Sequence, residues 1–192
     1  MNAVQDWVQL AIRSIADPRA AGAEVKHLPS ALTWPAFWLV AILGGVSTQL
    51  SLYLTPIEGF PTLGGPVGFV AFVAAGMMGL VAAFTASGRL FGGTGTFEQL
   101  LAVVTWMQGL RVTAQITLLI GSLVLGDAFA FLVGVLVMLI GVWVAVNFVA
   151  AVHEIEPVPA LIAVVLGGIA VAILLSFLWS LAAPQMSELP LA

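Results

Sequence analysis

The segment Val158–Leu181 reads VPALIAVVLGGIAVAILLSFLWSL and contains no charged residue. It is longer than the about 20 apolar residues that a membrane-spanning helix needs. The apolar run is continuous, which favours a helix over a strand with alternating faces. Because a helix satisfies its own backbone hydrogen bonds in lipid, we expect this segment to cross a membrane.

Four further segments have the same character. They are Pro35–Leu54, Val67–Ala86, a stretch within Phe97–Leu125 and a stretch within Ala128–Val152. Of the 192 residues 61% are hydrophobic and 7% are charged, against roughly 25% charged in soluble domains. The sequence therefore predicts an all-α polytopic membrane protein. We expect this protein to consist of a cytoplasmic amphipathic segment over residues 1–34, a bundle of five transmembrane helices over residues 35–182 and a short tail over residues 183–192.

Composition and charge exclude several classes of function. The chain has no cysteine, so it has no disulfide, thiolate metal ligand or cysteine nucleophile. Its net charge of −4 argues against a nucleic-acid partner. The stretch His153–Pro157 holds one His and two Glu, but a metal site needs three or four convergent ligands. A solvated turn is the preferred interpretation, and we expect no catalytic residue, no bound metal and no cofactor.

Residues 2–16 form a predicted amphipathic helix. Its apolar face carries Val4, Trp7, Val8, Ala11, Ile12 and Ile15. A helix of this kind lies in the membrane interface. Asp17 should end it, because the residue before a proline avoids helical geometry.

The basic residues indicate the orientation of the chain. Arg13, Arg19 and Lys26 precede the first predicted span, and Arg89 lies between the second and the third. The other loops and the tail contain no Lys or Arg. Since cytoplasmic loops carry the excess of basic residues, we expect a cytoplasmic N-terminus and, with five spans, a C-terminus outside.

A polar stripe follows the third predicted span. Its members, which recur at helical spacing and so share one face, are Thr105, Gln108, Arg111 and Gln115. An arginine at the bilayer centre costs about 2.5–3.5 kcal/mol. We therefore expect Arg111 to face protein rather than lipid.

The partner of this stripe is predicted on the fourth span, because the turn at Gly126 makes the two spans antiparallel neighbours. Counting back from the turn places Arg111 near Trp143 and Asn147. We expect a cation–π contact with the first and a hydrogen bond with the second, with Glu154 as the nearest carboxylate. The stripe is either polar glue between two helices or the lining of a path for an ion or a substrate.

A glycine-rich loop joins the second and third spans. It reads Gly92-Gly93-Thr94-Gly95-Thr96 and lacks the Gly-Lys-Ser/Thr ending of a nucleotide-binding loop. Thr96 and Gln99 instead have the spacing of a capping box at the start of a helix. With Arg89 nearby, the same helix N-terminus is an alternative site for an anion or a lipid headgroup.

The stretch Gly88–Gln99, which reads GRLFGGTGTFEQ, resembles the Yip1 family. The layout of a cytoplasmic N-terminal segment followed by five closely spaced helices is similar too, and Asp17-Pro18-Arg19 fits bacterial members. Eukaryotic relatives bind small GTPases of vesicle traffic, which bacteria lack. The resemblance therefore implies a protein of the bacterial inner membrane that organises membranes or binds proteins, and not an enzyme.

We expect a non-enzymatic scaffold or accessory protein that contacts membrane lipids and binds another membrane protein or a second copy of itself. Its contact surfaces would be the amphipathic helix, the loop Arg89–Gln99 and small-residue faces such as Ala41/Gly45 and Ala163/Gly167. The alternative is a small transporter or channel with a path along Gln108, Arg111 and Gln115. Exposure of that stripe to water would distinguish the two.

Overall fold

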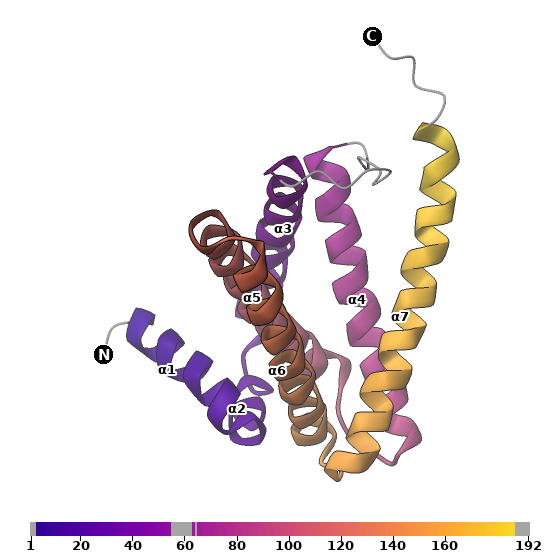
Figure 1. The fold of residues 1–192 in the computed structure, drawn as a ribbon. Helices are drawn as coiled ribbons and strands as arrows, with labels where there is room; N and C mark the ends of the chain where they lie inside the picture. The colour runs from indigo at the N-terminus through magenta and orange to yellow at the C-terminus, as the bar shows by residue number, and fades with distance from the viewer. Residues whose placement is uncertain (1–2, 55–62, 64, 187–192) are drawn as a thin grey trace.

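The computed structural model describes residues 3–54, 63 and 65–186, which form seven α-helices and no strand (Figure 1). The helices are α1 (Ala3–Ala16), α2 (Pro18–Val25), α3 (Ser30–Leu54), α4 (Pro66–Leu90), α5 (Phe97–Leu125), α6 (Asp127–His153) and α7 (Pro157–Met186). Five of them, α3 to α7, are long and apolar enough to cross a membrane. The predicted all-α polytopic fold with five membrane helices is confirmed.

Four of the observed helices, α3, α4, α6 and α7, extend beyond the predicted spans. α4 continues past the predicted end at Ala86 to Leu90. α3 begins at Ser30 and contains Pro35 inside it, whereas we predicted that the span begins at that proline. The earlier start is stabilised at Thr33, whose amide and hydroxyl both bond to the Pro29 carbonyl. α7 continues to Met186, so the predicted tail begins within a helix, and its residues 187–192 lie outside the described part of the chain.

The N-terminal segment contains a second helix that the sequence analysis did not predict. α1 ends at Ala16, as the Asp17-Pro18 pair indicates, but Pro18 then begins α2. The Asp17 carboxylate caps this helix by accepting a hydrogen bond from the Ala20 amide at 3.2 Å. Gly22 of α2 lies against α6, where an added Cβ would come within 3.1 Å of the Phe148 Cα.

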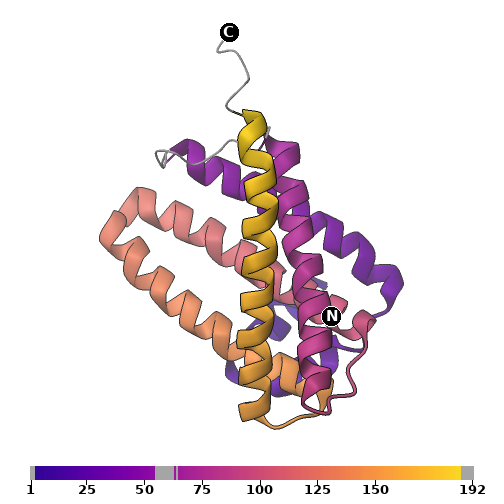
Figure 2. The same ribbon diagram turned by 90° about the vertical axis from the view of Figure 1, so that its right-hand side faces the viewer.

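The helices form a bundle in which α4 and α7 lie side by side, α3 packs on α4, and α5 and α6 form an antiparallel hairpin (Figures 1 and 2). The hairpin packs on α3 and tilts away from the upper part of α7 (Figure 1). The α4–α5 loop, the α6–α7 loop and α2 all lie at the lower end of the bundle in Figure 1. We call this end the loop end.

Small residues bring the helices close together within the chain. An added Cβ at Gly45 of α3 would lie 2.7 Å from the Val70 backbone nitrogen of α4. An added Cβ at Gly167 of α7 would lie 2.6 Å from a ring carbon of Phe84. Two of the small-residue faces that the sequence offers therefore serve packing inside the bundle.

Packing is densest toward the loop end. Fully or almost fully buried side chains there come from α2, α4, α5 and α6. They are Val25, Val81, Leu100, Leu101, Phe148, Val149 and Val152. The far ends of α5 and α7 instead present large apolar side chains outward, with Val124 76% exposed. In a membrane these outward surfaces face lipid chains.

Gly45→Ala should lower the free energy of unfolding by about 1–3 kcal/mol, the usual cost of overpacking. The new methyl group would lie within 2.8 Å of the Val70 backbone as well as of a Val70 methyl carbon, so α3 and α4 must separate. The thermal unfolding midpoint in detergent measures this loss. The control is Gly168→Ala in α7, where an added Cβ meets no atom within 4 Å; equal losses in the two variants would contradict the close approach.

Candidate functional site

The polar stripe of α5 does not form the buried cluster that we predicted. Thr105 is buried, and its hydroxyl oxygen has no hydrogen-bond partner among the described residues. Gln115 is half-buried. Arg111 is exposed, and its guanidinium donates a hydrogen bond at 3.3 Å to the Gln108 side chain one turn earlier. The expectation that Arg111 faces protein is therefore wrong.

The predicted partners on α6 have other contacts. Trp143 is 57% exposed, and the buried Asn147 side chain donates to the Trp143 carbonyl at 2.9 Å. Glu154 pairs with Lys26. Among the described residues, no hydrogen bond or ion pair joins Arg111 to any of the three. The count from the turn gives the level of a residue along the hairpin, but not the direction in which its side chain points around the helix axis.

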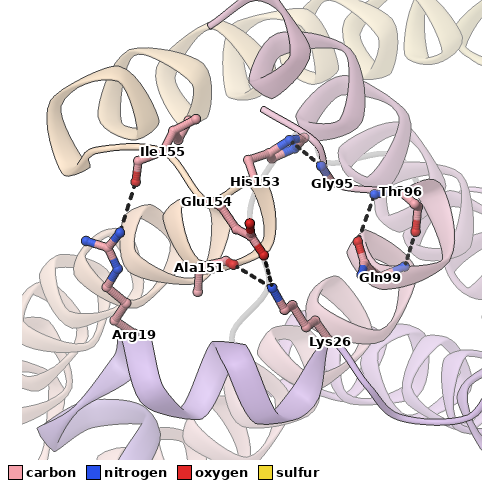
Figure 3. Close-up of polar contacts among 9 residues, drawn as sticks. All are labelled: Arg19, Lys26, Gly95, Thr96, Gln99, Ala151, His153, Glu154 and Ile155. Atoms are coloured by element: carbon pink, nitrogen blue, oxygen red, sulfur yellow. Dashed lines mark hydrogen bonds and ion pairs between the residues drawn. The ribbon is translucent and has the colours of Figure 1, made fainter. Parts of the chain in front are cut away.

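The loop end is organised around His153, the last residue of α6, which is 1% exposed. Its Nδ1 accepts a hydrogen bond from the Gly95 amide at 3.2 Å, shown in Figure 3. The ring proton therefore sits on Nε2, which lies 3.0 Å from the Phe84 carbonyl of α4 and donates to it. The Thr94 amide also donates to the His153 carbonyl at 3.2 Å. One neutral imidazole thus joins α4, the α4–α5 loop and α6.

Three glycines make room for this ring. An added Cβ at Gly88 would overlap the His153 Nε2, and one at Gly93 would lie 2.5 Å from Nδ1. At Gly95 it would lie 2.8 Å from a methyl carbon of Val152. Much of the glycine-rich motif is therefore explained by His153, which lies 58 residues after Gly95 in the chain.

Gly92 has a different role, because it ends α4. Its φ of +81° lies in the left-handed region that glycine adopts without strain. The Gly93 amide bonds to the Gly88 carbonyl and the Gly92 amide to the Arg89 carbonyl, each at 3.0 Å. These two bonds define a Schellman motif, a standard helix C-terminus.

The predicted capping box at the start of α5 is confirmed. The Gln99 amide donates to the Thr96 hydroxyl at 3.3 Å, and the Thr96 amide donates to the Gln99 side-chain oxygen at 3.0 Å (Figure 3). Side chains of the chain itself therefore occupy these amides, which an anion at this helix N-terminus would otherwise use. Arg89, at the end of α4, is exposed.

Arg19 of α2 and Lys26, the C-cap of α2, bind the C-terminal end of α6. The Lys26 ammonium donates to the Ala151 carbonyl at 3.2 Å and lies 3.0 Å from a Glu154 carboxylate oxygen. The Arg19 guanidinium donates to the Ile155 carbonyl at 3.2 Å (Figure 3). Cations at a helix C-terminus satisfy its free carbonyls and its dipole. No local pattern in the sequence points to these partners, which lie 125 to 136 residues away.

Glu154 has an unusual backbone for its residue type. It follows α6 with φ +59°, in the left-handed region, and the Ile155 amide reaches back to the Ala150 carbonyl at 3.2 Å. The hydrogen bond and the charge of Lys26 hold the pKa of the exposed Glu154 carboxyl below its ordinary value. The predicted solvated turn is thus a helix end fixed by an ion pair.

α1 packs against α5 through a tryptophan. The Trp106 indole donates to the buried Ser14 hydroxyl at 2.9 Å, and the rings of Trp7 and Trp106 lie 5.9 Å apart. Most of the predicted apolar face of α1 stays open, with Val8 43%, Ile12 61% and Ile15 53% exposed. The side chain of Val4 lies outside the described residues.

An apolar groove of about 800 Å³ lies beside this contact. α1 contributes Trp7, Val8, Ile12 and Ile15, α5 contributes Gln108 and Arg111 among other residues, and α6 contributes apolar residues from Val133 to Ala145. We call this feature the lateral groove. Of the three residues of the predicted polar path, Gln108 and Arg111 line this groove and Gln115 does not.

Gly93→Ala should destabilise the protein by about 1–3 kcal/mol, because its methyl group must displace the His153 ring. A double-mutant cycle tests this cause. Adding Gly93→Ala to a His153→Ala background should cost less than adding it to the wild type, since the obstacle is gone. Thermal midpoints in detergent give both values, and strictly additive losses would contradict the steric explanation.

Acid should remove the contribution of Glu154 to stability. Its folded pKa lies below the ordinary value of 4.5, so the Lys26 pair stabilises the fold fully above that pH and is lost as the pH falls through the lower, folded value. The midpoint of the wild type should exceed that of Glu154→Gln at neutral pH and approach it in acid. The control, Glu156→Gln in the same turn, should follow the wild type; a pH-independent difference for Glu154→Gln would contradict the argument.

Residues 12–181 match the Yip1 domain. Comparison with curated proteins and with solved structures found no match. The matched region begins in α1 at Ile12 and ends in α7 at Leu181. It therefore includes the five candidate membrane helices and the loop around His153, and the chain belongs to the Yip1 family.

Proposed function

We propose that the protein is a non-enzymatic accessory or scaffold protein that binds another membrane protein through the α4–α5 loop. Membership of the Yip1 family supports a membrane accessory or scaffold role in general. The observation that carries the specific proposal is the fixed backbone of this loop. The Schellman motif fixes the start of the loop, His153 binds the amides of Thr94 and Gly95, and the capping box fixes its end at Thr96.

The helix ends on either side of the fixed loop present side chains outward. Leu90 is 76% exposed, Phe97 is 37% exposed, and the charged Arg89 and Glu98 are exposed beside them. A rigid surface that combines apolar and charged side chains loses little conformational entropy when it binds. The His153 imidazole is buried and both its nitrogens are engaged, so the loop is built to hold its shape.

The orientation of this surface is part of the proposal. Arg13, Arg19, Lys26 and Arg89 all lie in the N-terminal segment or at the end of α4. By the excess of basic residues, the loop end faces the cytoplasm of a bacterial cell and the C-terminus lies outside the inner membrane. A partner would then be a protein of the same membrane with a cytoplasmic face.

Leu90→Ser together with Arg89→Glu should abolish recovery of a stoichiometric partner, because these changes remove the exposed apolar side chain and reverse the charge beside it. The measurement is native mass spectrometry of the tagged protein, expressed at native level and released gently from its own membrane. The thermal midpoint of the variant should stay within a few degrees of the wild type.

The matched control is Val158→Ser in the first turn of α7, a side chain that is 69% exposed. It should leave partner recovery unchanged. A wild-type protein that emerges alone, or a partner retained by the Leu90→Ser, Arg89→Glu variant, would overturn the proposal.

A further inference from the structure

We infer that the lateral groove binds an anionic phospholipid, with the phosphate at Arg111 and Gln108 and an acyl chain along α5 and α6. This site goes beyond the proposed docking of a protein at the α4–α5 loop and does not depend on it. The inference rests on the charge, the depth and the lining of the groove.

The charge of Arg111 calls for an anion. Its guanidinium is exposed within a span and, among the described residues, hydrogen-bonds only to the neutral Gln108 side chain. Ionisable residues in membrane spans are nearly always paired, because a charge without a partner is costly there. Guanidinium and phosphate form charge-assisted hydrogen bonds that are about twice as strong as neutral ones.

The contact between α1 and α5 sets the depth of this charge. Trp106 bonds to Ser14 of α1, and the exposed apolar residues of α1 suit a helix in the membrane interface. Arg111 follows Trp106 by five positions, about 7.5 Å of helix at ~1.5 Å per residue. Arginine side chains in helices lean toward the N-terminus and extend to the interface. The guanidinium can therefore meet a phosphate at the level of the headgroups.

The lining of the lateral groove suits an acyl chain. Beyond Arg111 the groove continues along Leu118 of α5 and along Val133, Val137 and Ile140 of α6. Its volume of about 800 Å³ lies in the range of ligand sites in proteins. Basic pockets between membrane helices on the cytoplasmic side are a recurrent form of site for anionic headgroups.

A second copy of this chain is a poorer occupant. The acidic residues in the sequence of α3 to α7 are Glu98 and Asp127, each at the first or second position of its helix. A symmetric pair of copies through this groove would bring two Arg111 side chains together without a carboxylate between them. Like charges at an interface are destabilising, so the lipid fits better.

Arg111→Gln tests the proposal, with phosphatidylglycerol as the anionic probe and phosphatidylcholine as the zwitterionic one. In native mass spectrometry of the delipidated full chain, the wild type should bind one phosphatidylglycerol in preference to phosphatidylcholine. The variant should bind it about tenfold more weakly, the loss expected for one charge-assisted hydrogen bond. Arg13→Gln, which removes an exposed cation paired with Glu24, is the control and should keep the preference.

Gly141→Phe tests the groove without changing any charge. Gly141 lines it, and an added Cβ there meets no atom within 4 Å, so the ring should fill the groove without disturbing the bundle. Binding of phosphatidylglycerol should fall while the thermal midpoint of the lipid-free protein stays unchanged. Equal binding of the two lipids by the wild type, or unchanged binding in Arg111→Gln and Gly141→Phe, would overturn the proposal.

A third outcome would assign the groove to a protein. If Gly141→Phe releases a membrane partner and leaves lipid binding unchanged, the occupant is a helix of that partner, and the lipid proposal is wrong. If the Leu90→Ser, Arg89→Glu variant loses the partner and Gly141→Phe keeps it, the partner binds the loop surface and not the lateral groove. The two proposals can therefore fail separately.

Discussion

The structure depends on one buried imidazole. His153 accepts from the loop at Gly95 and donates to α4 at Phe84, and both contacts require the neutral ring in a single tautomer. Each bond alone contributes little, about 1 kcal/mol net. Together they hold in place three segments that are distant in the chain. The glycines at positions 88, 93 and 95 follow from this arrangement, because larger residues would occupy the space of the ring.

A second set of contacts completes the loop end from the N-terminal side. α2 lies on α6 at Gly22. Lys26 binds the Ala151 carbonyl in the last turn of α6, and Arg19 binds the Ile155 carbonyl just after that helix. The side chain of Lys26 is only 10% exposed. Arg19 and Lys26 are thus structural caps at the C-terminal end of α6. Arg111, inside α5, instead has no carboxylate partner among the described residues.

The candidate site was only partly predictable. The capping box of Thr96 and Gln99 and the break at Asp17 were correct because they depend on residues within one turn of each other. The contact of Arg111 with Trp143 and Asn147 was wrong, because helical counting gives depth and not rotation about the axis. The role of His153 was missed for a different reason. Its partners lie 58 and 69 residues away along the chain, so no local pattern contains them.

The sequence by itself determined the class of the protein, because uninterrupted apolar runs in lipid leave the backbone no alternative to the helix. It also determined the local caps and the break between α1 and α2. Tertiary structure alone decided which side chains meet: that His153 occupies the space left by the glycines, that Lys26 caps α6, and that Arg111 opens to a groove. These outcomes depend on the azimuth and spacing of whole helices, which are set by packing over the entire bundle and leave no trace in any short stretch of sequence.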